Sequence, residues 1–185
     1  MANKLVFSPD GKTLACAGTG ELHVYNAADG RPIPVVTDEE YKSAACVAFS
    51  ADGRHAASGG TSRQARVYET EGWTEVAKLQ HESAVWAVCL NADGSLLATG
   101  TDLRTAHVFD VHAEEELVRV RHDAALTAIA MDPEGKILVT GSEDRTARVW
   151  WISPDQLMER AASRATRPLN DEEQRRFGTH TDRDR

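Results

Sequence analysis

The 185-residue sequence lacks the features that mark membrane proteins, secreted proteins and nucleic-acid-binding proteins. No run of 18 or more apolar residues is present, so no segment is expected to cross a membrane as a helix. The N-terminus has no apolar stretch of signal-peptide length, which favours a cytoplasmic protein. The net charge of −8 is opposite in sign to the basic surface that a phosphate backbone requires, so no nucleic-acid partner is expected.

Residues that carry chemistry are also scarce. The three cysteines, Cys16, Cys46 and Cys89, show no metal-ligand spacing and lie in apolar alternations, which predicts reduced thiols in the core and no metal site. The sequence has no phosphate-binding glycine-lysine loop, so it carries no nucleotide hydrolase of its own. We therefore expect no cofactor and no catalytic residues.

What the sequence does contain is one motif repeated four times. The words FSPDG, FSADG, LNADG and MDPEG begin at residues 7, 49, 90 and 131, so successive copies are 42, 41 and 41 residues apart. A period near 40 residues indicates a repeat architecture. The acidic residue and the glycine of each word suit a tight turn, because the side chain can hydrogen-bond locally and glycine tolerates positive φ.

Each copy places short β-rich runs around its turn word. A run such as LTAIAM (126–131) precedes the word, and two more runs follow it, for example KILVTG and TARVWW. The first three copies add a fourth run: RPIPVV, TEVAKL and ELVRVR. This order predicts four antiparallel sheets, of four strands each except for the last, which lacks its fourth strand.

The spacing, together with the words FSPDG, VTGSED and ARVW, resembles WD40 repeats, which form the four-stranded blades of β-propellers. The resemblance covers residues 4–152. It implies four repeats within residues 1–152, at about 1–40, 41–81, 82–122 and 123–152. We expect an all-β fold of WD40-like propeller blades in an open arc or half propeller, because four blades are few for this family.

The resemblance also implies a buried hydrogen-bond set of His, Ser or Thr, Asp and Trp in each blade. Only the last repeat carries the complete set, namely His122, Thr140, Asp144 and Trp150. In the third repeat His81 and Thr99 remain, but Leu103 takes the Asp position and Phe109 the Trp position. These residues are expected to be structural, and the last blade is expected to be the stiffest.

A candidate partner-binding rim follows from the same resemblance, which brings the turns between second and third strands to one end of the blades. Arg63, Arg104 and Arg145 occupy matching positions in these turns. A ring of guanidinium groups suits an acidic peptide or a phosphorylated partner. Acidic residues expected near the same rim weaken this field, and a solvated rim is the alternative.

Trp73 is the one tryptophan outside the repeat words, in the loop before a fourth strand. It is either an exposed interface anchor on this candidate surface or a residue that caps the edge of a blade.

Four blades in an open arc leave two bare end faces. These faces would be covered by closure of a strained four-blade ring, by a second chain in a homodimer that closes an eight-bladed ring, or by further blades of a longer protein.

A different segment follows the repeats. Ser153, Pro154 and Asp155 predict a helix start, so residues 153–178 are expected to form a helical tail and residues 179–185 to be disordered. The tail resembles the two-helix ending of bacterial WD40 arrays attached to signalling or effector domains, such as STAND NTPases, caspase-like domains and kinases. A helix that plugs the open side of the last blade is the alternative.

The expected function is a non-catalytic protein–protein interaction scaffold, the sensor-like C-terminal part of a bacterial signalling protein, with a protein or peptide partner. The first alternative is a self-associating half propeller. The second is an enzyme with a pocket at the centre of the ring, which the almost wholly apolar first strands of the repeats disfavour.

Overall fold

The computed structural model describes residues 2–18, 20–35 and 44–153. The chain divides into two units, Met1–Ser153 and Pro154–Arg185. The predicted helical tail, apart from Ser153, and the predicted disordered end lie outside the described residues.

The described part is built from strands alone, arranged in four antiparallel sheets in chain order. The first sheet contains β1 (Ala2–Phe7), β2 (Thr13–Gly18), β3 (His23–Asn26) and β4 (Pro32–Ile33). The second contains β5 (Cys46–Phe49), β6 (His55–Gly59), β7 (Gln64–Glu69) and β8 (Thr74–Gln80). The third contains β9 (Val85–Leu90), β10 (Leu96–Thr101), β11 (Thr105–Asp110) and β12 (Glu115–Arg121). The fourth contains β13 (Leu126–Met131), β14 (Ile137–Ser142) and β15 (Ala147–Trp151).

This order confirms the prediction of an all-β fold made of four antiparallel sheets. Within each sheet the strands follow one another without crossover, and each strand pairs with the next. Short strands joined by tight turns need only local pairing, which is why the period-two patterns of the sequence were enough to predict them.

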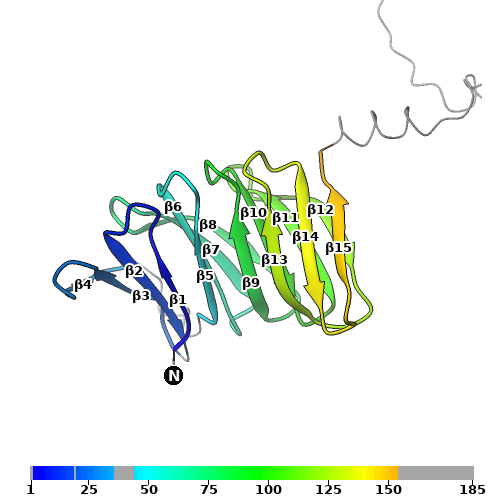
Figure 1. The fold of residues 1–185 in the computed structure, drawn as a ribbon, viewed down its shortest axis with the longest axis horizontal. Coiled ribbons are helices and arrows are strands. Elements are labelled where there is room, and N and C mark those ends of the chain that lie inside the picture. The colour runs from blue at the N-terminus through cyan, green and yellow to red at the C-terminus, as the bar shows by residue number, and fades with distance from the viewer. Residues whose placement is uncertain (1, 19, 36–43, 154–185) are drawn as a thin grey trace, which may run out of the picture. The chain divides into compact units, whose positions relative to one another are not determined.

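The four sheets stand in a row with their first strands adjacent. β1 contacts β5, β5 contacts β9, and β9 contacts β13. In Figure 1 the blue first sheet and the yellow-to-orange last sheet lie at opposite ends of this row, so the described sheets form an open array. Each end sheet therefore has one face against a neighbouring sheet and one face without a neighbouring sheet.

The turn words form the tight turns that the sequence predicts. Gly11, Gly53, Gly94 and Gly135 have φ values of 71°, 73°, 77° and 70°. The polar residue at the second position of each word closes the turn, because its side chain accepts the backbone N–H five residues later, as Ser8 does from Thr13 at 2.9 Å. The turns of neighbouring sheets are also joined, since the N–H of Asp52 donates to the carbonyl of Ala92, and the N–H of Ala92 donates to the carbonyl of Pro133.

The core lies between adjacent sheets in three apolar clusters. Val24 of the first sheet clusters with Val47 and Tyr68 of the second, and comparable clusters join the second sheet to the third and the third to the fourth. Alternate residues of each inner sheet thus face opposite neighbours, so a single sheet cannot bury its apolar side chains alone.

The three cysteines are free thiols, and the predicted core position is confirmed for Cys46, whereas Cys16 and Cys89 are half-buried. Burial raises the pKa of Cys46 and of Cys89 to about 12, which keeps both thiols protonated and unreactive at neutral pH.

Candidate functional site

The structure brings His122, Thr140, Asp144 and Trp150 together in the last sheet. His122 Nδ1 lies 2.9 Å from an Asp144 carboxylate oxygen, and His122 Nε2 lies 2.6 Å from the Thr140 hydroxyl. The Trp150 indole N–H donates to the same hydroxyl at 2.8 Å. Hydrogen bonds from the Thr146 hydroxyl and the His122 ring hold the pKa of Asp144 well below its usual value. An ionised Asp144 places the proton on His122 Nδ1, so every polar side-chain group of this four-residue network has a partner.

The matching positions of the third sheet leave the same kind of network incomplete. Both ring nitrogens of His81 and the hydroxyl of Thr99 are buried and have no hydrogen-bond partner among the described residues. Phe109 has no donor to offer, and Leu103 turns outward and is 49% exposed. Burial is the main reason that the pKa of His81 falls to about 4, so this ring is neutral at neutral pH.

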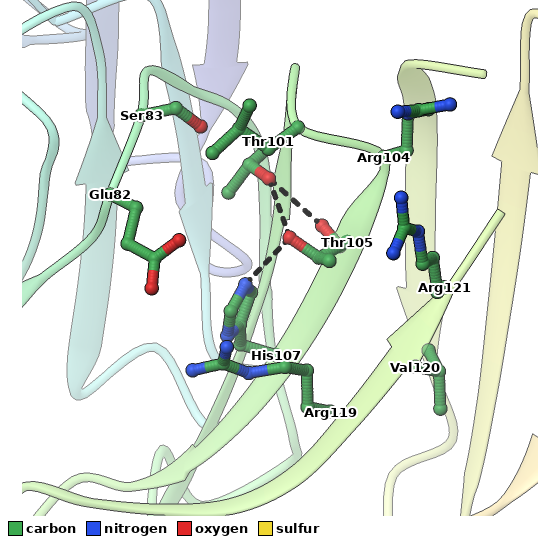
Figure 2. A pocket seen from close by; sticks show the side chains of 10 residues that line it. Glu82, Ser83, Thr101, Arg104, Thr105, His107, Arg119, Val120 and Arg121 are labelled. Carbon is green, nitrogen blue, oxygen red and sulfur yellow. Dashed lines mark hydrogen bonds between the residues drawn. The ribbon is translucent and has the colours of Figure 1, made fainter. Parts of the chain in front are cut away.

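A pocket of about 420 Å³ opens beside this incomplete network, and Figure 2 shows it from close by. His107 stands where the fourth sheet has Arg148, whose guanidinium donates to Asp123 at 2.7 Å. Leu103 stands where the fourth sheet has Asp144. The arginine and the aspartate of the fourth sheet are therefore replaced at the matching positions of the third sheet by a histidine and an outward-facing leucine.

Three arginines line this pocket: Arg104, from the β10–β11 turn, and Arg119 and Arg121, from β12. Arg119 is held by Glu116 through two hydrogen bonds of 2.7 and 2.8 Å. Glu82 lies on the opposite side of the pocket from Arg104 and Arg121 in Figure 2. Arg104 could be predicted from its place in the repeat, whereas the pocket could not, because its lining comes from three separate segments of the chain.

The three candidate rim residues Arg63, Arg104 and Arg145 are all exposed, at the same position of three successive sheets. Each adopts positive φ, at 59°, 69° and 67°. The carbonyls of Arg63 and Arg104 accept the N–H of His81 and His122, which fastens each turn to the residue that follows the fourth strand of the same sheet. The backbone at these positions is therefore fixed by the turn, while the guanidinium groups extend from an exposed position.

Trp73 is not an exposed anchor. It is 2% exposed and packs against Tyr68 and Phe49, with ring centroids 6.3 and 5.9 Å away. Its φ of 49° turns the chain at the β7–β8 connection and directs the indole into the cluster between the first two sheets. Trp73 is thus removed from the candidate partner-binding surface.

A second pocket, of about 270 Å³, lies along the first strands of all four sheets, where an enzyme of this fold would have its central active site. Lys4 and the buried thiol of Cys46 are the only ionisable groups in its lining, and Trp86 is its largest side chain. This lining offers little for acid–base or nucleophilic chemistry. In the part of the chain that the structure describes, no cluster of His, Cys, Asp and Glu is arranged to hold a metal ion.

No helix in the described ranges is long and apolar enough to cross a membrane.

Sheets of this kind, stacked with their first strands adjacent, define blades of a β-propeller. The family model described as "WD domain, G-beta repeat" matches residues 34–69, 73–110 and 115–150. The chain therefore belongs to the WD40 repeat family. The second and third matches begin at the outermost strand of one sheet and end in the third strand of the next.

Two solved structures are similar to the chain. The structure of U3-55K superposes with a TM-score of 0.74 at 22% identity, and the match covers 83% of this chain and 49% of that one. The crystal structure of the computationally designed Ika4 protein superposes with a TM-score of 0.71 at 20% identity, and the match covers 83% of this chain and 92% of that one. The chain thus spans about half the length of U3-55K. No curated protein sequence matches it.

Proposed function

We propose that the chain is a non-catalytic recognition scaffold that binds an acidic protein segment at the rim carrying Arg63, Arg104 and Arg145. WD40 propellers generally mediate protein–protein interaction. The observation that carries the proposal is the pocket beside Arg104, where Arg121 adds a second exposed guanidinium. The turns that carry Arg63 and Arg104 are held by hydrogen bonds to the residue after the fourth strand of their own sheet, so little ordering of these turns opposes binding.

A carboxylate fits the chemistry of this pocket. Planar guanidinium groups donate two parallel hydrogen bonds to a carboxylate or a phosphate, and the hydroxyl of Ser83, which also lines the pocket, adds a further donor. Glu82 and the pairing of Arg119 with Glu116 reduce the positive field, so the pocket suits one or two carboxylates of a peptide rather than the densely charged backbone of a nucleic acid.

The sequence of the tail supports a more specific setting for this scaffold. Residues 155–177 resemble the ending of bacterial WD40 arrays attached to effector domains, which favours a sensor-like part of a cytoplasmic signalling protein.

The test is binding of a fluorescein-labelled hexaglutamate peptide to the full chain, measured by anisotropy at 50 mM salt. Arg104→Gln and Arg121→Gln should each weaken binding about three- to fivefold, because an exposed pair contributes up to about 1 kcal/mol. Glutamine keeps the side-chain length and removes the charge. Arg54→Gln is the matched control, since Arg54 is also an exposed arginine but lies before β6, at the end of that strand away from the rim turn of Arg63.

Equal affinities for the wild type, both rim variants and the control would refute the rim as the site. A second probe, the same peptide carrying one phosphoserine, separates the two acidic ligands. Stronger binding of this probe that depends on Arg104 would make a phosphorylated partner the better assignment.

A further inference from the structure

The outer face of the last sheet is apolar, and no described residue packs on it. Ala130, Val139 and Val149 are cross-strand neighbours on one face of β13, β14 and β15, and Ala147 lies on the same face. Val139 is 37% exposed, Val149 is 51% exposed, and both alanines are exposed. We call these four residues the trailing face.

The outer face of the first sheet is uncovered as well. Leu5, Phe7, Leu14 and Tyr25 lie on one face of β1, β2 and β3, with Phe7 paired to Leu14 and Leu14 paired to Tyr25. Leu5 is 59% exposed and Phe7 is 60% exposed. We call these four residues the leading face.

The first three sheets have a face that corresponds to the trailing face of the last sheet, and in each of them the next sheet covers it. The positions of Val139 and Val149 correspond to Ala15 and Val24 in the first sheet, Ala57 and Val67 in the second, and Ala98 and Val108 in the third. These six residues are at most 2% exposed, because each pair packs on the next sheet. Among the four sheets that the structure describes, only the fourth pair has no sheet to pack on.

The leading face shows the converse pattern. Leu5 and Phe7 correspond to Val47 and Phe49 in the second sheet, which belong to the cluster that joins it to the first sheet. Val47 is 2% exposed, against 59% for Leu5. The leading and trailing faces are therefore the two halves of one contact that the chain makes three times between its own sheets.

A second copy of the chain is the occupant that supplies both halves at once. Strands spaced about 4.8 Å apart and about 18 Å long give each face on the order of 300 Å². One junction then buries about 600 Å² in total, which is below the size of a stable interface, whereas two junctions bury about 1,200 Å², which reaches it. A pair of copies that makes both junctions also leaves no bare face.

We propose that the trailing face of one copy docks on the leading face of a second copy, and that the two copies close a ring through two such head-to-tail junctions. The inference is independent of the proposed peptide site, because neither face includes the arginine rim.

The test starts with the molar mass of the full chain by light scattering and sedimentation between about 1 and 100 μM. The mass expected is twice 20.2 kDa. Phe7→Arg places a charge in the leading face, and Val149→Arg places one in the trailing face. Each change should prevent docking at that face, so each variant alone should be a monomer. Because both side chains are more than half exposed in the single chain, the variants should keep the far-ultraviolet circular dichroism of the wild type.

Mixing the two variants distinguishes head-to-tail docking from docking of like faces. The mixture still contains one intact trailing face and one intact leading face, so it should form a dimer at least tenfold weaker than the wild type. Leu117→Arg is the matched control, since Leu117 is 54% exposed on β12 and should leave the dimer unchanged.

Three results would overturn the proposal. The first is a wild-type chain that stays monomeric at 100 μM, which would mean that something other than a second copy covers these faces. The second is a single-face variant that remains dimeric, as docking of like faces requires. The third is an assembly of more than two copies.

Discussion

The hydroxyl of Thr140 links two side chains of the buried network in the last sheet, the His122 ring and the Trp150 indole. Its hydroxyl accepts from the indole of Trp150 and lies 2.6 Å from His122 Nε2. Thr140 is fully buried, so water cannot replace it. Thr99 occupies the matching position of the third sheet and is also fully buried, but its hydroxyl has no partner among the described residues.

Thr140→Val should lower the free energy of unfolding by about 2 kcal/mol, because two buried polar groups lose their partner while the shape of the side chain is kept. Thr99→Val, which makes the same change where no hydrogen bond exists, should be neutral or slightly stabilising. Urea denaturation followed by tryptophan fluorescence measures both. Equal effects at the two positions would contradict the role given to the network.

The turn word is the element that the sequence shows most clearly, and its glycine is needed for two separate reasons. Gly11 and Gly94 both have positive φ, at 71° and 77°. A Cβ on Gly11 would meet no atom within 4 Å, whereas a Cβ on Gly94 would overlap the ring of His55 in the neighbouring sheet. A substitution of Gly11 therefore tests the turn conformation alone, whereas a substitution of Gly94 tests the turn conformation and the packing of one blade on the next.

Gly11→Ala should cost about 1 kcal/mol of stability, which is the cost of placing an L-residue in the left-handed region. Gly94→Ala should cost at least twice as much, since the ring of His55 must also move. Thermal unfolding monitored by circular dichroism gives both values. A cost at Gly94 no greater than at Gly11 would show that the second and third sheets are not packed at this turn as described.

Strand order and turns could be predicted from the sequence because both depend on residues close together in the chain. The burial of Trp73 could not, since it results from the left-handed turn at that residue and from Tyr68 and Phe49 on other strands. The same holds for Arg66, which is fully buried and paired with Glu75 at 2.6 Å although the sequence presents it as one more polar residue of a strand. Side-chain environments set by neighbouring sheets are the part that a single sequence does not show.

At the scale of the whole array, the two end sheets differ in the interactions that stabilise them against local unfolding. Each has one neighbouring sheet, and the central strands β2 and β14 are both flanked by partners within their own sheets. The first sheet ends in β4, which has only two residues, and its strand β2 carries Cys16 at the position where the last sheet has Thr140. The last sheet has three strands within the described residues but contains the complete buried network. In a stacked array each sheet opens according to its own stability and that of its one junction.

The amides of β14 should therefore exchange with solvent more slowly than those of β2, by about 30-fold if the network contributes about 2 kcal/mol to the local opening free energy. Hydrogen exchange of the full chain followed by mass spectrometry resolves the two strands. Thr140→Val should remove most of the difference by accelerating β14 while leaving β2 unchanged. Faster exchange of β14 than of β2 in the wild type would mean that the missing fourth strand outweighs the network, and that the expectation of a stiff last blade is wrong.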